Sequence, residues 1–320
     1  MIRRSSVRDL LEDHYRPRKL LGKSPRSLTD LRGSLNAWAK SLGREPELAD
    51  LTDEAVAAFL AWYHGQPVSQ SRSRHELASV EKQRRNLVAL ANFAVKLRWL
   101  DEPLSLEPVD VPYREPQAWS DEQLACLLGE AAKTPGSISG VAAGPWWVAL
   151  ILLIYACGPR ITAIMRLRWS DLYLDERLVL FRAETQKQGN EQMIGYSPRV
   201  AAALERIRQP ARELVFCWPF DRQAGNWQTL RRHLTRMQAR AGLPVDSKSK
   251  FHRLRKTTAT VIADTFSEEE ACRQMGHSDP RLTRARYIQR AKLKKQRQMW
   301  DSLPVPAFEE PSQSRQLELF

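Results

Sequence analysis

A proline-rich break about a third of the way along the chain is the feature that most restricts how these 320 residues can fold. Four prolines interrupt the hydrophobic periodicity there: Pro103, Pro108, Pro112 and Pro116. Because proline lacks the amide hydrogen that a helix or a central strand uses, neither element is expected to continue through the break. Ser120-Asp121-Glu122-Gln123 then forms a capping-box pattern, which marks the start of a new helix. The sequence therefore predicts two domains, 1–105 and 118–300, with residues 106–117 as a linker and 301–320 as a tail.

The residues before the break have the periodicity of amphipathic helices. Ser24 and Pro25 are typical of a helix start, and the apolar face that follows them ends at Gly43. Thr52 precedes a second helix, which begins with acidic residues at its positive end. A third helix is expected from about Ser73 to Trp99. The prediction for this domain is a small helical bundle with one basic edge.

The second domain is also expected to be mainly helical. Its longest apolar stretch, Trp146 to Cys157, is shorter than the ~20 residues needed to span a bilayer, which indicates a buried helix. Leu178 to Phe181 and Gln192 to Tyr196 flank the turn at Gly189 and are predicted to form strands. The predicted fold class is mainly α, with a helical bundle followed by an α-rich domain that carries a small antiparallel sheet. The tail is expected to lack stable structure of its own, or to pack on a neighbouring subunit.

The net charge points to a class of partner. Fifty Lys and Arg against 37 Asp and Glu give a formal charge of +13. Basic residues gather between 222 and 256, opposed there only by Asp246: Arg222, Arg231, Arg232, Arg236, Arg240, Lys248, Lys250, Arg253, Arg255 and Lys256. A solvated surface or an anionic lipid would also suit a positive charge, but this clustering favours a nucleic-acid backbone.

The N-terminus and the cysteines bear on the compartment. Met1 to Arg4 lead into polar sequence without the apolar run of a secretory signal, so a cytoplasmic protein is expected. The four cysteines are widely spaced and form no paired motif, which favours buried reduced thiols over disulfides or a zinc site.

Several short motifs of the second domain occur in a characteristic order. Gly158-Pro159-Arg160 is followed by Leu167-Arg168-Trp169-Ser170-Asp171, then by His252-Arg253-Leu254-Arg255, by Gly276-His277-Ser278-Asp279-Pro280, and finally by Tyr287. This series resembles the tyrosine recombinase, or phage integrase, family. The resemblance covers Ser120 to Gln289, and the helical first domain is similar to the core-binding domain of that family.

The resemblance implies a strand-transfer reaction on DNA. Moving a phosphodiester onto a protein hydroxyl requires a nucleophile, hydrogen-bond donors for the phosphate oxygens, and a proton for the leaving oxygen. The resemblance assigns Tyr287 as the nucleophile, and Arg160 and Arg255 as the clamp that holds the phosphate. It assigns His252 and His277 as further hydrogen-bond donors or proton carriers, and Lys187 as the acid that protonates the leaving oxygen. Guanidinium suits the clamp because it stays charged and donates two hydrogen bonds. No cofactor or metal is expected.

The sequence departs from the family pattern in three places. Ala163 stands where an acidic residue is frequent, and Lys256 stands where histidine is frequent. The interval from His277 to Tyr287 is one residue longer than in many relatives.

The partners implied are double-stranded DNA with short inverted-repeat core sites and further copies of the chain, as a tetramer in the synaptic complex, without a membrane. DNA contacts are expected from six basic residues: Arg84, Arg85, Arg231, Arg232, Lys250 and Lys256. No extra small domain precedes the bundle, so arm-site binding is not expected. Two other functions stay open, a type IB topoisomerase and a catalytically silent DNA-binding protein. Integration, excision, inversion and dimer resolution all fit the recombinase interpretation.

Overall fold

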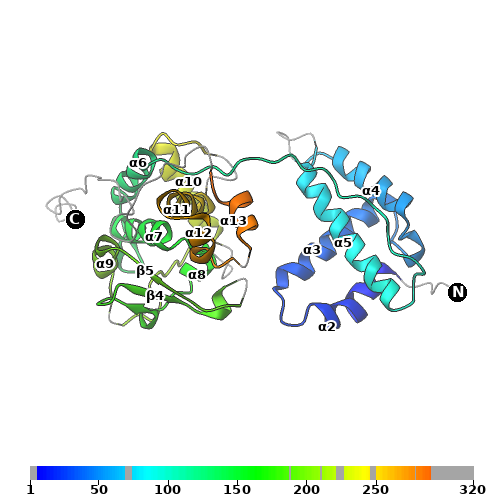
Figure 1. The fold of residues 1–320 in the computed structure, drawn as a ribbon, viewed down its shortest axis with the longest axis horizontal. Helices are drawn as coiled ribbons and strands as arrows, with labels where there is room; N and C mark the ends of the chain where they lie inside the picture. The colour runs from blue at the N-terminus through cyan, green and yellow to red at the C-terminus, as the bar shows by residue number, and fades with distance from the viewer. Residues whose placement is uncertain are drawn as a thin grey trace. The chain divides into compact units, whose positions relative to one another are not determined.

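The structure, a computed structural model, describes residues 6–68, 74–186, 189–209, 211–220, 227–245, 250–277 and 279–289. The chain divides into two compact units, residues 1–113 and 114–320. Both are built mainly of helices, and the second also contains short antiparallel strands (Figure 1), which confirms the predicted fold class.

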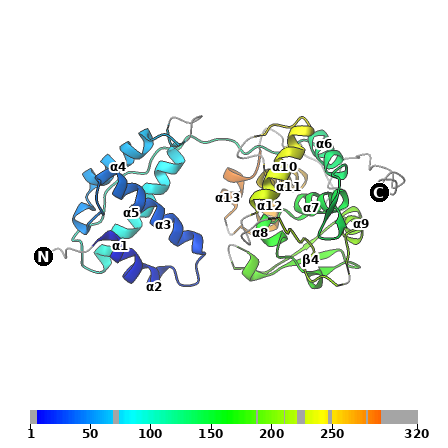
Figure 2. The same ribbon diagram turned by 180° about the vertical axis from the view of Figure 1, so that it is seen from behind.

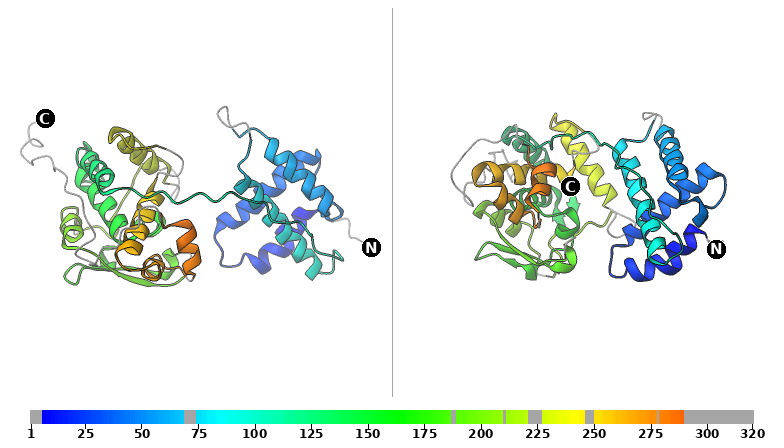
Figure 3. Two further views of the ribbon diagram at one scale, coloured as in Figure 1. Left: turned by 45° about the horizontal axis from the view of Figure 1, so that its top comes forward. Right: turned by 45° about the vertical axis from the view of Figure 1, so that its right-hand side comes forward.

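The first unit is a helical bundle. Its long helices α3 (Pro25–Leu42), α4 (Asp53–Gly65) and α5 (Leu77–Lys96) pack pairwise against one another, as the blue and cyan ribbons of Figure 3 show. Shorter turns complete it: α1 (Val7–Asp9), the π-helical η1 (Leu10–Tyr15), α2 (Arg16–Lys19) and the 3-10 turn η2 (Leu48–Asp50). Trp38, Phe59 and Leu87 are buried at its centre.

The predicted start and end of the first long helix and the predicted start of the second are confirmed. The Ser24 side chain accepts a hydrogen bond from the Arg26 amide, and Gly43 ends α3 with a φ of 70°. The Thr52 side chain accepts from the Ala55 amide at the start of α4. The prediction for the third helix was too long, because α5 ends at Lys96 and Arg98 adopts the left-handed region with a φ of 57°.

The proline-rich segment contains no helix or strand, as expected, but its first half is packed on the bundle. Leu104, Leu106 and Val109 contact the core of the first unit. The Ser105 amide donates to Asp53 at 2.8 Å, and the Val109 amide donates to Glu81 at 3.0 Å. These contacts make the residues up to 109 part of the bundle surface.

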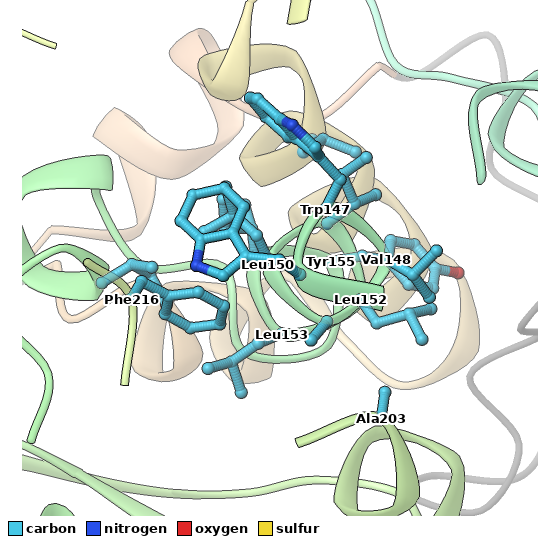
Figure 4. Close-up of a cluster of buried hydrophobic side chains, with 14 of the residues drawn as sticks. Trp147, Val148, Leu150, Leu152, Leu153, Tyr155, Ala203 and Phe216 are labelled. Carbon is cyan, nitrogen blue, oxygen red and sulfur yellow. The ribbon is translucent and has the colours of Figure 1, made fainter. Parts of the chain in front are cut away.

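The second unit is arranged around one buried helix, α7 (Ala143–Cys157). It is in contact with α6 (Asp121–Ala132), α9 (Pro198–Glu205) and α11 (Phe251–Thr265) (Figure 1). Leu150, Leu153 and Phe216 lie in the apolar cluster around it (Figure 4). A helix that is apolar on all sides is stable only when neighbours cover every face, so the predicted burial of the Trp146–Cys157 stretch is confirmed.

The remaining helices lie on this core. Helix α10 (Gln228–Arg240) packs on α6 (Figure 2), while α12 (Glu268–Gln274) contacts both α11 and α13 (Pro280–Arg286). The short helix α8 (Ile161–Ile164) directly follows the end of α7. The capping box predicted at Ser120 is present, with reciprocal hydrogen bonds between Ser120 and Gln123.

In the described part of the second unit, two small antiparallel sheets accompany the helices. The predicted hairpin is confirmed as β4 (Leu178–Phe181) and β5 (Gln192–Gly195), with Val179 opposite Ile194. The sequence did not predict β3 (Leu172–Tyr173), which lies beside β4, or the hairpin of β1 (Ser137–Ile138) and β2 (Val141–Ala142). Strands of two residues are too short to show a periodicity. The 3-10 turns η3 (Trp169–Asp171) and η4 (Ala183–Thr185) flank this sheet.

Within the described residues, no helix combines the length and the apolar character that crossing a membrane would require. All four cysteines are free, and Cys157 and Cys272 are buried as predicted. The prediction is wrong for Cys126, which is exposed on α6, because its helical position faces away from the apolar side of that helix.

Candidate active site

Arg160 stands at a sharp turn between two helices. Helix α7 ends at Gly158, whose φ of 65° redirects the backbone, and Arg160 is the N-terminal cap of α8. The Arg160 side chain is partly buried, and its Nη1 atom, which no solvent reaches, has no hydrogen-bond partner among the described residues. A buried guanidinium donor without a partner is available to an anionic ligand.

Arg255 is held in place by backbone carbonyl groups. It lies on α11 and is only 3% exposed. Its Nη1 donates to the Gly158 carbonyl, and its Nη2 donates to the Met275 carbonyl at 2.7 Å. Its Nε is buried and has no hydrogen-bond partner within the described part of the chain. Burial lowers the pKa of Arg255 to about 10, with the charge of Arg160 acting in the same direction and the interaction with Tyr287 opposing it. Arg255 is therefore still charged at neutral pH.

His277 lies against the same guanidinium. Its Nε2 is 3.1 Å from Arg255 Nη2, and its Nδ1 is 2.8 Å from the Thr283 hydroxyl. Burial, together with the charges of Arg255 and Arg160, lowers the pKa of His277 to about 4. The imidazole is therefore neutral at pH 7.

Tyr287 caps the C-terminus of α13, and its ring is surrounded by three of the predicted site residues. The ring centre lies 4.7 Å from that of His277 and 5.1 Å from that of His252, and the Arg255 guanidinium carbon is 5.1 Å from the ring centre. Tyr287 is 9% exposed, more buried than its arginine-rich sequence neighbourhood suggests.

His252 closes the group from the first turn of α11. The residue as a whole is exposed to solvent, although surrounding atoms partly desolvate its ring. This burial, with the charges of Lys256, Arg255 and Arg160, lowers the pKa of His252. Because Arg160 influences the pKa of His252, Arg255 and His277 alike, its charge lies near all three. The structure thus brings together Arg160, His252, Arg255, His277 and Tyr287.

The sixth predicted catalytic residue, Lys187, lies outside the described residues. The strands that lead to it, β4 and β5, are described, and Gln192 at the start of β5 donates from Nε2 to the carbonyls of Arg273 and Gln274. Those carbonyls are at the end of α12, shortly before His277. Gln192 therefore attaches the hairpin to the His277 side of the site.

Among the predicted DNA-contacting residues of the bundle, Arg84 and Arg85 differ sharply. Arg84 donates to both carboxylate oxygens of Glu81 and to the Leu106 carbonyl, and its side chain is 12% exposed. Arg85 is 66% exposed and lies 3.6 Å from Glu81. Arg84 consequently has a structural position, whereas Arg85 presents its charge to solvent.

The other four predicted DNA contacts belong to the second unit. Arg231 and the exposed Arg232 lie on α10. Lys250 is the N-terminal cap of α11, and Lys256, one residue after Arg255, is half-buried.

Three polar residues at the site were not predicted from sequence: Thr260, Thr283 and Gln289. The Thr260 hydroxyl accepts from the Gln289 amide at 2.9 Å and donates to the Tyr287 carbonyl at 3.3 Å. The available signal was weak, since only the closeness of Thr283 and Gln289 to Tyr287 in the sequence pointed to them. Within the described part of the chain, no three His, Cys, Asp or Glu side chains gather as a metal site would require.

The fold and this cluster can now be compared with known proteins. Residues 121–294 match the phage integrase family. A tyrosine recombinase XerD of Rhizobium meliloti (strain 1021) is 26% identical over 265 residues, which is 79% of each chain.

Solved structures share the fold. A lambda integrase dimer bound to a COC' core site superposes with a TM-score of 0.64 at 18% identity, covering 86% of this chain and 75% of that one. The Tn1549 transposon integrase in complex with transposon right-end DNA gives a TM-score of 0.67 at 14% identity, covering 87% and 93%. Because the family match spans more than half of its residues, the chain belongs to the phage integrase family, the tyrosine recombinases that cleave and rejoin DNA.

Proposed function

We propose that Tyr287 is the nucleophile of a site-specific recombination reaction. Its hydroxyl oxygen would bond to the scissile phosphorus as the bond from phosphorus to the 5′ oxygen breaks, leaving a 3′-phosphotyrosyl link and a free 5′ hydroxyl. The tyrosine proton goes to a neighbouring base, and Lys187 supplies a proton to the leaving oxygen. Attack by the 5′ hydroxyl of another strand reverses the step, so the bond energy is conserved.

One observation carries this proposal: at this site two buried guanidinium donors have no hydrogen-bond partner among the residues that the structure describes. These are Nη1 of Arg160 and Nε of Arg255. Leaving buried donors unpaired costs free energy, about 1–3 kcal/mol each, which an anionic ligand would recover. Phosphate oxygens have the charge and the acceptor geometry for this role.

The histidines fit the same reaction. Since the lowered pKa values leave His252 and His277 neutral near pH 7, each ring offers one donor and one acceptor nitrogen. A neutral imidazole 5.1 Å from the Tyr287 ring, ring centre to ring centre, is close enough to assist removal of the hydroxyl proton once DNA is bound.

A nicked suicide substrate tests the proposal. Cleavage next to the nick releases a short fragment, so the covalent protein–DNA adduct accumulates and is seen on a denaturing gel. We expect an adduct with the wild type, none with Tyr287→Phe, and wild-type amounts with Tyr173→Phe, which alters an exposed tyrosine on β3. An adduct that persists in Tyr287→Phe would remove Tyr287 from this role.

The same substrate set separates the alternatives. Relaxation of supercoiled DNA without any recombinant product would favour a topoisomerase, and DNA binding without an adduct would favour a silent binding protein. Two sites placed on one plasmid would yield recombinant product only from a recombinase.

We further propose a separate role for each segment of the chain. Residues 1–105 would act as a core-binding DNA domain, 106–117 as linker, 118–300 as catalytic domain and 301–320 as an inter-subunit tail. The partners would be duplex DNA with short inverted-repeat core sites and, in the synaptic complex, three further copies of the chain. A lambda integrase tetramer has been solved on a Holliday junction, which supports a tetrameric assembly. Such a substrate places the protein in the cytoplasm, at the nucleoid.

A further inference from the structure

Thr283 occupies an unusual position between two residues of the site. It lies in the middle of α13 and is fully buried, with a relative exposure of 0%. Its hydroxyl faces His277 Nδ1 at 2.8 Å, and its carbonyl accepts from the Tyr287 amide at 2.9 Å. One residue thus contacts both the histidine and the proposed nucleophile.

The hydrogen bonds around His277 determine which of its nitrogens carries the proton. Arginine can only donate, so His277 Nε2, at 3.1 Å from Arg255 Nη2, must be the acceptor. The proton of the neutral ring is then on Nδ1, and the Thr283 oxygen accepts it. The DNA-free site therefore holds His277 as the Nδ1–H tautomer.

A bound phosphate changes what the site requires of the same ring. Phosphate oxygens near Arg255 are acceptors only, so His277 can contribute a hydrogen bond to them only from a protonated Nε2. A neutral ring with its proton on Nε2 must accept at Nδ1. A backbone carbonyl or a carboxylate beside Nδ1 could not donate to it, whereas a hydroxyl group can.

We propose that Thr283 is a positioning residue whose hydroxyl allows His277 to exchange tautomers when the scissile phosphate binds. Without DNA, Thr283 accepts from Nδ1 and Arg255 donates to Nε2. With DNA, the Thr283 hydroxyl rotates and donates to Nδ1, and Nε2–H turns from Arg255 to a phosphate oxygen. This inference rests on the proposed function, because it takes the phosphate to bind beside Arg255 and His277.

Burial and local charge support the exchange. His277 is 7% exposed, so water has little access to replace the Thr283 hydroxyl as partner of Nδ1. Burial and the adjacent guanidinium groups lower the pKa of His277, which keeps the ring neutral in the DNA-free site. A neutral ring carries one nitrogen-bound proton, so its hydrogen bonds depend on whether Nδ1 or Nε2 holds that proton.

Nitrogen NMR of the imidazole side chains reads the tautomer directly. In the free wild-type protein labelled with ¹⁵N-histidine, His277 should show a protonated Nδ1 and an unprotonated Nε2, with its signals assigned by their loss in His277→Gln. On binding a duplex core site by the Tyr287→Phe variant, which cannot cleave, the pattern should change to a protonated Nε2. A free protein already in the Nε2–H form, or no change on binding DNA, would overturn the inference.

Two substitutions separate the hydroxyl from the packing. Thr283→Val keeps the shape without the hydroxyl, and Thr283→Ser keeps the hydroxyl. We expect the rate of adduct formation to fall by about tenfold or more in Thr283→Val and to stay within about threefold of wild type in Thr283→Ser, with unchanged DNA affinity in both. Equal rates of adduct formation in Thr283→Val and the wild type would overturn the inference that the Thr283 hydroxyl positions His277.

The two proposals fail in different ways. If the wild type forms no adduct, the proposed function fails, while the tautomer of free His277 can still be read. If Thr283→Val does not fold, Thr283→Ser and the spectra of the wild type and Tyr287→Phe still decide the matter.

Discussion

The backbone amide of Ala118 donates a 2.7 Å hydrogen bond to Oε1 of Gln289, a residue 171 positions further along the chain. Next to it, the Trp119 amide donates to the Thr257 hydroxyl at 2.8 Å. Gln289 follows Tyr287 by two residues, and Thr260 bridges the backbone of both. The start of the second unit is therefore attached directly to the segment that carries the proposed nucleophile.

Removing this attachment should slow strand cleavage. In Gln289→Leu the buried Ala118 amide loses its acceptor, which should lower the free energy of unfolding by about 1–3 kcal/mol and reduce the rate of adduct formation severalfold. Gln289→Glu retains an acceptor oxygen and is the matched control. The measurements are chemical denaturation and adduct formation on the suicide substrate. Equal cleavage rates in Gln289→Leu and the wild type would show that the hydrogen bond between Ala118 and Gln289 does not affect catalysis.

A methyl group at residue 158 should disturb the arginine clamp. Gly158 has a φ of 65°, and an added Cβ would overlap Met275 Cε, while the Gly158 carbonyl accepts from Arg255. We expect Gly158→Ala to lower the free energy of unfolding by about 1–2 kcal/mol from backbone strain alone, and to reduce cleavage further by displacing Arg255.

Gly189 provides the control for this substitution. Its φ is 70°, but none of the described residues lies within 4 Å of an added Cβ. Gly189→Ala therefore carries the backbone strain without the overlap. If both variants lose the same stability and activity, close packing at Gly158 has no role.

The sequence predicted the parts of the fold that depend on local interactions. Helix caps at Ser24, Thr52 and Ser120 are visible because each cap and its partner lie within a few residues. The buried helix α7 was predictable because its apolar run is continuous. The order of short motifs predicted the site residues, and the structure brings four of them, His252, Arg255, His277 and Tyr287, into contact.

What the sequence did not reveal depends on partners that are distant in the chain. Gln289 and Thr257 gain their roles from amides 171 and 138 positions away. The contact of Arg84 with the Leu106 carbonyl was likewise not predicted, because it exists only where the proline-rich segment packs on the bundle. No local pattern carries that information.

The low pKa of His277 makes stability depend on pH. Its pKa is about 4 in the folded protein, below the 6.5 of an ordinary histidine, so the unfolded chain binds more protons between these values. The stabilisation is complete above pH 6.5 and is lost as the pH falls toward 4. From pH 7 to pH 5 we expect this residue alone to cost about 2 kcal/mol.

Chemical denaturation at pH 7 and pH 5 measures this loss by comparison with His277→Gln, which can still accept from Arg255 but does not titrate. The carboxylates whose pKa is lowered by arginine partners, including Glu12, Asp50 and Glu81, are present in both proteins and cancel in the comparison. An equal loss of stability in both proteins would show that the pKa of His277 is the same in the folded and unfolded states.

Arg84 and Arg85 are adjacent on α5 and should respond in opposite ways to substitution by alanine. Arg84→Ala removes two hydrogen bonds to Glu81, which keeps the Val109 amide and Arg85 as partners, and one to the Leu106 carbonyl. We therefore expect a loss of about 2 kcal/mol in the free energy of unfolding. Arg85→Ala removes an exposed charge and should leave stability within about 0.5 kcal/mol of wild type. If Arg85 neutralises one DNA phosphate, its loss should reduce the slope of log affinity against log salt by about 0.9. Denaturation and DNA binding at several salt concentrations measure both effects, and a DNA-affinity loss confined to Arg84→Ala would reverse the assignment.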